Sequence, residues 1–474
     1  MSLLLLLLLL LLSLFSGVSA EVPLTRTHVT SLPGFNGALP SRLETGFVRQ
    51  KFFAIMFYLT MTRYVTVDEE NGAELFYYFF ESEGDPGSDP VLLWLTGGDR
   101  CSVLSALFFE IGQQPNSKQA PLSPKSVRSC GPLKLVIEPY NGSLPRLHYH
   151  PYSWTKVASI LFVDSPVGAG FSFSRDPKGY DVGDVSASLQ LVKFLSNWFG
   201  GHPEYLTNPF YVGRDSYAGK IVPFIAQKIS EDIEAGVRPT LNLKGYVVDN
   251  PTTGERIDYE SKVPYLHGVG IISDQLYELL NEVSKPHILY KKCIYMSLIP
   301  KFESMDRKIL KEELGILKHR PPRPSIQCVS YSNYLSYFWA NDNVTREYLG
   351  IKKGSVDEWI RCHDNDLPYT KDIKSSIQYH HNVTLNGYRA LVYSGDHDTV
   401  LPFLGTQTWV RSLNYPIVDD WRAWHVDGQS AGFTVAYGNN LTFATVKGGG
   451  HTAPEYQPGR CSAMFRRWIS NMPL

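Results

Sequence analysis

Short apolar runs recur along the chain and are separated by amphipathic stretches. The runs are rich in β-branched and aromatic residues, as buried strands are, and they cover residues 74–81, 90–95, 158–163, 210–212, 243–248, 389–393 and 441–446. Residues 185–198 and 220–234 instead alternate between apolar and polar faces, as helices do. Because short apolar strands alternate with helices, we expect an α/β fold in which helices flank a central, mostly parallel sheet.

Residues 258–359 differ in character from the rest of the chain. Charged helical segments with a proline break at 321–324 replace the apolar runs. We interpret this region as a helical insertion over the active edge of the sheet, within one domain that covers residues 21–474. The basic residues of 301–323 are interleaved with Glu and Asp, which favours a solvated helix face over a binding patch.

Residues 1–20 have the pattern of a secretory signal peptide. An apolar core precedes Val18-Ser19-Ala20, which places small residues at the positions that a signal peptidase requires. The apolar run is too short for a good membrane span. We therefore expect a protein of the secretory pathway that has no membrane attachment once the signal is removed. Sequons that fit this route lie at Asn141, Asn343, Asn382 and Asn440.

Composition narrows the function classes. The 474 residues, 43% of them hydrophobic, suffice for one large core, and a net charge of -1 counts against a nucleic-acid partner. The six cysteines include no C-x-x-C pair, so disulfides are favoured over structural zinc. His148 with His150 and His380 with His381 lack acidic partners at ligand spacing, and 168–170 is too short for a dinucleotide loop. We expect no metal and no cofactor.

Residues 210–223 combine a strand, a tight turn and the start of a helix, with Ser216 on the turn. A serine there is exposed at the edge of the sheet, and the free N–H groups of the following helix can stabilise an oxyanion. Serine alone is a weak nucleophile near neutral pH and needs a base that a carboxylate orients. The turn is therefore a candidate nucleophile elbow that requires two partners.

Two candidate partners follow downstream. The strand that ends at Tyr393 leads to Asp398, and the strand that ends near Val446 leads to His451 after three glycines. Both residues lie just past the carboxyl ends of strands, where open α/β sheets place their chemistry. Taken singly, the serine motif is explained as a turn, the glycine run as a loop and Asp398 as a helix cap. Together, the order Ser, Asp, His is that of α/β-hydrolases and favours a triad.

From about residue 32 to residue 474 the chain resembles plant serine carboxypeptidase-like proteins. The motifs that carry the resemblance are residues 93–98, 154–171, 215–219, 394–398 and 449–455. The resemblance implies an α/β-hydrolase fold, with Ser216 as nucleophile, His451 as general base and then acid, and Asp398 orienting the imidazole. It implies an oxyanion hole made of the N–H groups of Gly98 and Tyr217, and a final location that is extracellular or vacuolar.

The resemblance also implies disulfides and substrate-binding positions. It pairs Cys101 with Cys362 and Cys293 with Cys328, and it leaves Cys461 as a free, buried thiol. The substrate-binding positions that it implies are Thr96, Gly97, Glu110 and Asp215.

Two of these positions bear on what attacks the acyl-enzyme. Carboxypeptidases of the family have Asn where this chain has Thr96, and Glu where it has Asp215. In those enzymes the Glu shares a proton with a second carboxyl, whose position Glu110 occupies in this chain. The shared proton allows the two carboxyls to bind a peptide's terminal carboxylate. Thr96 with Asp215 resembles the branch that uses glucose esters of phenolic or other acids as acyl donors. We therefore favour acyl transfer from a glucose ester to an acceptor hydroxyl in plant secondary metabolism. A carboxypeptidase acting on peptides is the alternative.

Three residues depart from the family pattern near the proposed site. Asp99 and Arg100 replace Pro-Gly, and Arg214 stands where the elbow normally has Gly. Pro and Gly fix the backbone that aims an oxyanion donor, so the replacements support a second alternative, an inactive secreted homologue. The long side chain of Arg214 must leave the elbow sideways, either to pair with Asp99 or to reach an anionic substrate.

Three longer features interrupt the family pattern. Residues 47–63 and 113–130 separate segments that the family joins, and near 283–285 the insertion lacks a stretch with a cysteine pair. Retained introns and a skipped exon explain these features, and so do genuine surface loops. The apolar run 52–59 is unfavourable when exposed, which favours the splicing explanation.

Overall fold

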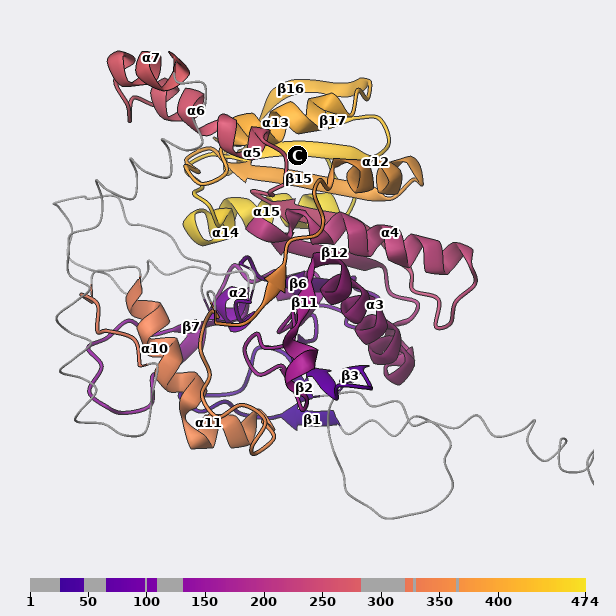
Figure 1. Ribbon diagram of the computed structural model, residues 1–474, viewed down its shortest axis with the longest axis vertical. Coiled ribbons are helices and arrows are strands. Elements are labelled where there is room, and N and C mark those ends of the chain that lie inside the picture. Colours follow the sequence, from indigo (N-terminus) through magenta and orange to yellow (C-terminus); the bar gives the residue numbers. More distant parts are fainter. Residues whose placement is uncertain are drawn as a thin grey trace, which may run out of the picture.

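The computed structural model describes residues 26–46, 65–98, 100–108, 131–282, 320–326, 330–363 and 366–474 (Figure 1). The predicted signal peptide, residues 47–63 and 113–130 and the region around 283–285 lie outside the described residues. Asp99, Glu110, Cys293 and Cys328 also lie outside them. Among the helices of the described residues, none combines the length and the apolar character that a bilayer crossing needs.

Within the described residues, a mixed eleven-stranded sheet forms the centre of the fold. Its middle strands run parallel to one another, in the order β9 (Ser159–Val163), β6 (Val91–Leu95), β12 (Phe210–Asp215), β13 (Leu243–Asp249), β15 (Arg389–Gly395) and β18 (Leu441–Val446). Antiparallel strands complete both sides: β5 (Tyr77–Phe80), β2 (Leu43–Gly46) and β1 (Arg26–Val29) beyond β9, and β17 (Gln429–Tyr437) and β16 (Ile417–Val426) beyond β18. The carboxyl ends of the parallel strands therefore meet at one edge, which carries the predicted site residues.

Successive side chains of the strands fill two cores on opposite faces of the sheet. In β5, Tyr77 and Phe79 belong to one core, and Tyr78 and Phe80 belong to the other. The first core is covered by α3 (Asp184–Gly201), α4 (Ile221–Glu234), α12 (Ile377–Leu385) and α13 (Phe403–Ser412). The second core is covered by α2 (Leu104–Phe108), α10 (Ser330–Asn341) and α15 (Pro458–Ile469). Burial on both faces explains why the middle strands have uninterrupted apolar sequences.

The helices predicted at 185–198 and 220–234 correspond to α3 and α4. In α4, Ile221, Ile225 and Ile229 recur at every fourth position and are all buried against the sheet, as helical periodicity requires. The opposite face of α4 carries Gln227 and Glu231, which are hydrogen-bonded to each other at 2.7 Å. The pattern of apolar positions therefore sets both the position of α4 and the face that it turns to the sheet.

The sheet differs from the expectation in its first apolar run and in its outer strands. The run 74–81 forms two strands, β4 (Ala73–Leu75) and β5, because the N–H of Phe76 leaves the ladder and donates to Ser172 Oγ at 2.8 Å. β4 joins β3 (Val65–Asp68) and β10 (Phe173–Ser174) in a small separate sheet. The apolar runs also do not predict the outer strands β1, β2, β16 and β17. Of these, β16 lies at the sheet edge and half of its residues are exposed.

The described residues between 250 and 363 form helices in two places. α5 (Ile257–Glu260), α6 (Lys262–Gly268) and α7 (Asp274–Glu282) lie toward the top of Figure 1, and α10 and α11 (Asn343–Tyr348) lie at its lower left. The short strand β14 (Tyr369–Thr370) then pairs in parallel with β11 (Val182–Gly183), directly before α3. The pair β7 (Leu133–Leu135) and β8 (Leu147–Tyr149) and the short helix α14 (Ala453–Tyr456) complete the strands and α-helices of the described residues.

Candidate active site

Ser216 lies on a strained turn between a buried strand and a helix. β12 ends at Asp215, the 3₁₀ turn η4 (Ser216–Gly219) follows, and α4 begins at Ile221. Ser216 has a φ angle of 54°, in the left-handed region that residues other than glycine rarely adopt. The turn packs closely against the next strand end, since a Cβ on Gly219 would lie 2.3 Å from Pro251 Cβ. The strand, turn and helix expected around Ser216 are all present.

The structure brings together Ser216, His451 and Asp398, which three different strand ends supply. Ser216 Oγ lies 2.8 Å from His451 Nε2, and His451 Nδ1 lies 2.8 Å from Asp398 Oδ2. Asp398 is buried, and its carboxylate also accepts the backbone N–H groups of Val400 at 2.7 Å and Leu401 at 3.2 Å. A fixed carboxylate on Nδ1 leaves Nε2 of a neutral imidazole as the acceptor that faces the serine hydroxyl.

The surroundings of His451 change its basicity in opposite directions. Burial lowers the pKa of His451, but the hydrogen bond and charge of Asp398, with the charge of Asp215, outweigh this effect and leave the pKa raised above its usual value. Lys262 on α6 opposes the increase through its positive charge. The imidazole is therefore a stronger base than a free histidine.

Gly97 and Gly98 lie beside the nucleophile at the end of β6. A Cβ on Gly97 would lie 2.9 Å from Ser216 Cβ, so only glycine allows this close approach. Gly98 has a φ angle of 84°, and a Cβ there would lie 2.6 Å from Cys101 Sγ. The disulfide between Cys101 and Cys362 thus packs directly against the residue predicted to donate to an oxyanion.

The two arginines that depart from the family pattern are both buried and both bind backbone carbonyls. Arg214 donates to the carbonyl oxygen of Gly98 at 3.0 Å. Arg100 donates to the carbonyl oxygens of Val167, Tyr180 and Pro368. Arg214 therefore leaves the elbow sideways, as expected, and both guanidinium groups connect loops around the strand ends. The suggested pairing of Arg214 with Asp99 lies outside the described residues.

The predicted substrate-binding residues Thr96 and Asp215 are buried at the ends of adjacent strands, β6 and β12. Burial raises the pKa of Asp215, and the charges of Arg214 and His451 oppose this increase. The carboxyl that we expect to share a proton with Asp215, that of Glu110, lies outside the described residues.

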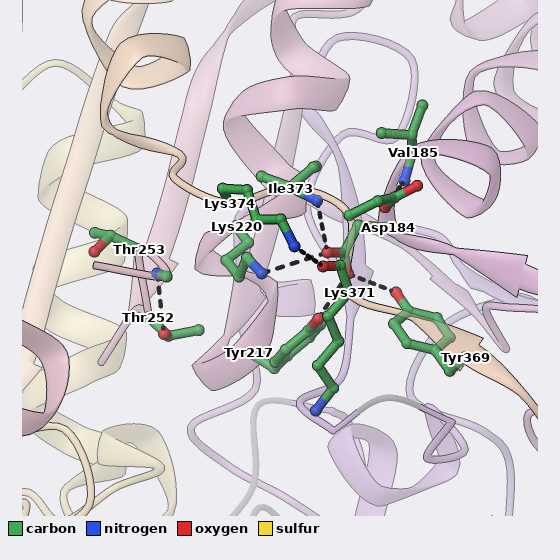
Figure 2. A network of polar contacts seen from close by, with 12 residues as sticks. Asp184, Val185, Tyr217, Lys220, Thr252, Thr253, Tyr369, Lys371, Ile373 and Lys374 are labelled. Atoms are coloured by element: carbon green, nitrogen blue, oxygen red, sulfur yellow. Dashed lines mark hydrogen bonds and ion pairs between the residues drawn. The ribbon is translucent and has the colours of Figure 1, made fainter. Parts of the chain in front are cut away.

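Asp184, at the start of α3, is the centre of a polar network that the sequence did not predict (Figure 2). Its carboxylate accepts the hydroxyl of Tyr217 at 2.7 Å, the hydroxyl of Tyr369 at 2.9 Å and the N–H of Ile373 at 3.1 Å. Lys220 Nζ lies 3.3 Å from the same group. Tyr217 directly follows Ser216, so this network anchors the side chain of the residue after the proposed nucleophile.

Asp249 is a second residue that sequence reasoning missed. It ends β13 in register with Asp215, and its Oδ2 accepts the N–H of Ala453 at 3.0 Å. Burial, together with the charges of Asp215 and Asp398, holds the pKa of Asp249 well above its usual value. Its position directly after the apolar run 243–248 was the available signal, because an acidic residue there falls at the same sheet edge.

The cysteines and sequons have the following positions. Cys101 is bonded to Cys362 as expected, and Cys461 is a buried free thiol. The asparagines of three sequons are exposed: Asn141, Asn343 and Asn440. Asn382 is half-buried on α12 and donates to Gln227 at 3.0 Å. Within the described part of the chain, no cluster of three or more His, Cys, Asp or Glu could hold a metal ion.

The fold is that of an α/β-hydrolase, with helices on both faces of the sheet and the candidate site at the carboxyl ends of its parallel strands. The chain belongs to the serine carboxypeptidase family, whose family model matches residues 57–471. Serine carboxypeptidase-like 19 and serine carboxypeptidase-like 11 of Arabidopsis thaliana are 41% and 44% identical to it, and each comparison covers 94% of both chains. The predicted family is confirmed.

Among solved structures, the chain is similar to Kex1Δp, a prohormone-processing carboxypeptidase from Saccharomyces cerevisiae. The TM-score is 0.67 at 18% identity, covering 95% of this chain and 96% of that chain. This similarity confirms the predicted fold.

Proposed function

We propose that this protein is an acyl-transfer enzyme that works through an acyl-Ser216 intermediate. The observation that carries the proposal is the chain of hydrogen bonds from Ser216 Oγ to His451 Nε2 and from His451 Nδ1 to Asp398 Oδ2, both 2.8 Å long. Membership of the serine carboxypeptidase family supports the same chemistry.

In the first half of the reaction, His451 Nε2 removes the hydroxyl proton of Ser216 as Oγ attacks the acyl carbonyl carbon. Asp398 stabilises the imidazolium and does not itself take the proton. The N–H groups of Gly98 and Tyr217 bind the oxyanion of the tetrahedral intermediate. The intermediate collapses when the bond to the leaving oxygen breaks, and that oxygen takes the proton from His451. The product is the acyl-Ser216 ester.

In the second half, an acceptor hydroxyl gives its proton to His451 and attacks the acyl-Ser216 carbonyl. Collapse releases the new ester and returns the proton to Ser216 Oγ. Water in place of the acceptor gives hydrolysis by the same steps. The groups that hold donor and acceptor therefore decide the reaction, and the triad does not.

We propose a glucose ester as the acyl donor and a hydroxyl group of a plant secondary metabolite as the acceptor. Thr96 lacks the amide, and Asp215 lacks the methylene, that the family's peptidases place at these positions. Both changes weaken the binding of a peptide's terminal carboxylate. Thr96, Gly97, Glu110 and Asp215 are the proposed substrate-binding residues.

A carboxypeptidase that releases C-terminal residues is the second candidate, and one observation favours it. Burial raises the pKa of Asp215, so this carboxyl keeps its proton to a higher pH than a free aspartic acid. A protonated carboxyl can donate a hydrogen bond to a peptide's terminal carboxylate. If this candidate is correct, peptide release should be favoured at acid pH.

The deciding experiment incubates the secreted chain with acyl-glucoses plus acceptor alcohols and, separately, with peptides. Mass spectrometry follows both donor loss and product identity, and the Ser216→Ala variant is the control. Acceptor esters that form with the wild type alone support acyl transfer. Release of C-terminal residues without consumption of acyl-glucose overturns it in favour of the peptidase. A folded chain that reacts with neither, and that a fluorophosphonate does not label, indicates the inactive homologue.

We also propose the maturation of the chain. Residues 1–20 are removed as a signal peptide, and residues 21–474 form one domain with an insertion at about 258–359. Cys293 and Cys328 form a second disulfide, and the exposed sequons carry glycans. The half-buried amide of Asn382 makes this asparagine the poorest of the four acceptors. The mature protein is delivered to the extracellular space or the vacuole, and intact-mass measurement before and after deglycosylation tests the processing.

A further inference from the structure

The chain that leaves β13 contacts the loops of all three proposed catalytic residues. This connecting segment, the last residue of β13 and the three that follow (249–252), is hydrogen-bonded to the chain at Ser216, to the loop of Asp398 and to the loop of His451. Asn250 at its centre is fully buried and has a φ angle of 40°. Asparagine tolerates this left-handed conformation better than most residues, and the buried position requires that its amide be hydrogen-bonded.

The amide nitrogen of Asn250 holds the backbone on both sides of His451. Asn250 Nδ2 lies 3.1 Å from the carbonyl oxygen of Gly450 and 2.6 Å from that of His451. These two carbonyls belong to the peptide groups that flank the Cα of His451. Nδ2 also lies 3.0 Å from Asp249 Oδ1. The imidazole is thus attached to a backbone whose two adjoining peptide planes are fixed by one side chain.

The amide oxygen of the same residue holds the loop of Asp398. Asn250 Oδ1 accepts the N–H of Gly395 at 3.0 Å, at the end of β15 and just before Asp398. Since acceptors surround the nitrogen and a donor faces the oxygen, the network itself determines which way the amide points. One side chain therefore connects the two loops whose spacing sets the contact between His451 and Asp398.

The segment also reaches the nucleophile, and a buried carboxylate keeps it rigid. The N–H of Thr252 donates to the carbonyl oxygen of Ser216 at 3.1 Å. Asp258 accepts the N–H groups of Thr253 and Gly254, each at 2.8 Å, and the hydroxyl of Thr252 at 2.6 Å. Movement of the connecting segment would therefore displace all three catalytic loops relative to one another.

We propose that Asn250 is a positioning residue that sets the distance and orientation of His451 relative to Asp398 and Ser216. This inference rests on the proposed function, because it concerns how fast Ser216 reacts. Small displacements of a catalytic base are costly, since a shift of about 1 Å can lower a rate roughly 100-fold. Loss of the Asn250 amide should therefore slow the attack by Ser216 without changing how a ligand first binds.

The test measures the reaction of the full secreted chain with a fluorophosphonate, and separates the maximal inactivation rate from the reversible binding constant of the probe. Asn250→Gly removes the amide and tolerates the left-handed backbone. Asn250→Asp keeps an acceptor for Gly395 but loses the donor to the His451 loop. We expect both variants to lower the maximal rate by about 10- to 100-fold, with the binding constant of the probe unchanged.

Asn208→Ala is the matched control. Asn208 is equally buried and donates to the carbonyls of Pro86 and Asp89, but it precedes β12 at the end opposite Ser216. The Asn208→Ala variant should be less stable than the wild type, and its folded fraction should keep the wild-type maximal inactivation rate. Wild-type rates in folded Asn250→Gly or Asn250→Asp would overturn the inference. A folded wild type that the probe does not label at all would instead refute the proposed function, so the two failures are distinguishable.

Discussion

At the scale of single residues, the environment of His451 decides how readily Ser216 can react. Asp398 is buried, accepts two backbone N–H groups and faces His451 Nδ1. The backbone donors hold the carboxylate in place, so the carboxylate in turn holds the imidazole ring. This arrangement makes His451 a base with a fixed orientation and a raised pKa.

Replacement of Asp398 by Asn should lower the maximal rate of fluorophosphonate labelling by about 10³- to 10⁴-fold, because the amide favours the wrong imidazole tautomer. Attack requires the neutral imidazole, so the rate falls as the pH drops through the pKa of His451. Asp398 raises that pKa, and its loss should therefore move the fall in rate to lower pH. Labelling rates measured across the pH range check both effects.

Asp419→Asn is the control for this prediction. Asp419 lies on β16 at the sheet edge, where it pairs with Arg422 at 2.6 Å. This variant should keep both the rate and the pH profile of the wild type. An Asp398→Asn variant with an unchanged pH profile would contradict the role given to the Asp398 carboxylate.

At the scale of elements, the buried carboxylate of Asp184 joins α3, η4 and β14. Tyr217 of η4 and Tyr369 of β14 both donate to Asp184 Oδ1, while Lys220 pairs with Oδ2 (Figure 2). The turn after the proposed nucleophile is therefore attached to a helix and a strand that are distant in sequence. Because Asp184 is fully buried, none of these contacts can be replaced by bulk water without local opening.

Asp184→Asn should lower the free energy of unfolding by about 3–5 kcal/mol, because Lys220 is then left buried without its ion-pair partner. The double variant with Lys220→Met should recover part of this loss, because the uncompensated charge is gone. Denaturant unfolding of both single variants and the double variant measures the coupling. Additive losses would contradict a direct interaction.

The surface ion pair of Lys193 and Glu69 is the control for the Asp184 and Lys220 variants. Its side chains remain 39% and 57% exposed. Lys193→Met should change the free energy of unfolding by less than about 1 kcal/mol, because exposed ion pairs are screened by water and salt.

At the scale of the whole molecule, the disulfide between Cys101 and Cys362 joins segments 261 residues apart in sequence. Backbone hydrogen bonds reinforce it, from Ser102 N to the carbonyl of Arg361 at 2.7 Å and from His363 N to that of Arg100 at 3.2 Å. The bond therefore attaches the chain that follows α11 to the loop that carries Gly98. The chain that follows α11 and the loop that carries Gly98 at the sheet edge should therefore move together.

The double variant Cys101→Ser, Cys362→Ser should lose roughly 3–5 kcal/mol of unfolding free energy, because the unfolded chain regains the freedom of a long loop. Fluorophosphonate labelling of its folded fraction should also slow, since Gly98 packs against Cys101. Cys461→Ala, which removes the buried free thiol and keeps the disulfide, is the control for labelling. An unchanged unfolding midpoint and labelling rate in the double variant would contradict both expectations.

The parts of the fold that the sequence predicts are those in which a local pattern is enough. The middle strands are buried on both faces and need continuous apolar runs, and α3 and α4 need apolar residues at helical spacing. Strand β16 escaped the prediction because it is an exposed edge strand, which places few demands on composition. The break at Phe76 was missed because its cause, the hydroxyl of Ser172, lies far along the chain.

By itself, the sequence determined the family, the α/β-hydrolase fold and the strand ends at which Ser216, Asp398 and His451 lie. It could do so because each of these features depends on residues that are adjacent in the chain. The tertiary structure alone decided that Arg214 holds the Gly98 carbonyl, that Asp184 anchors Tyr217 and that Asn250 connects two catalytic loops. These contacts join segments that only the packing of the sheet brings within hydrogen-bond reach, so no local pattern could predict them.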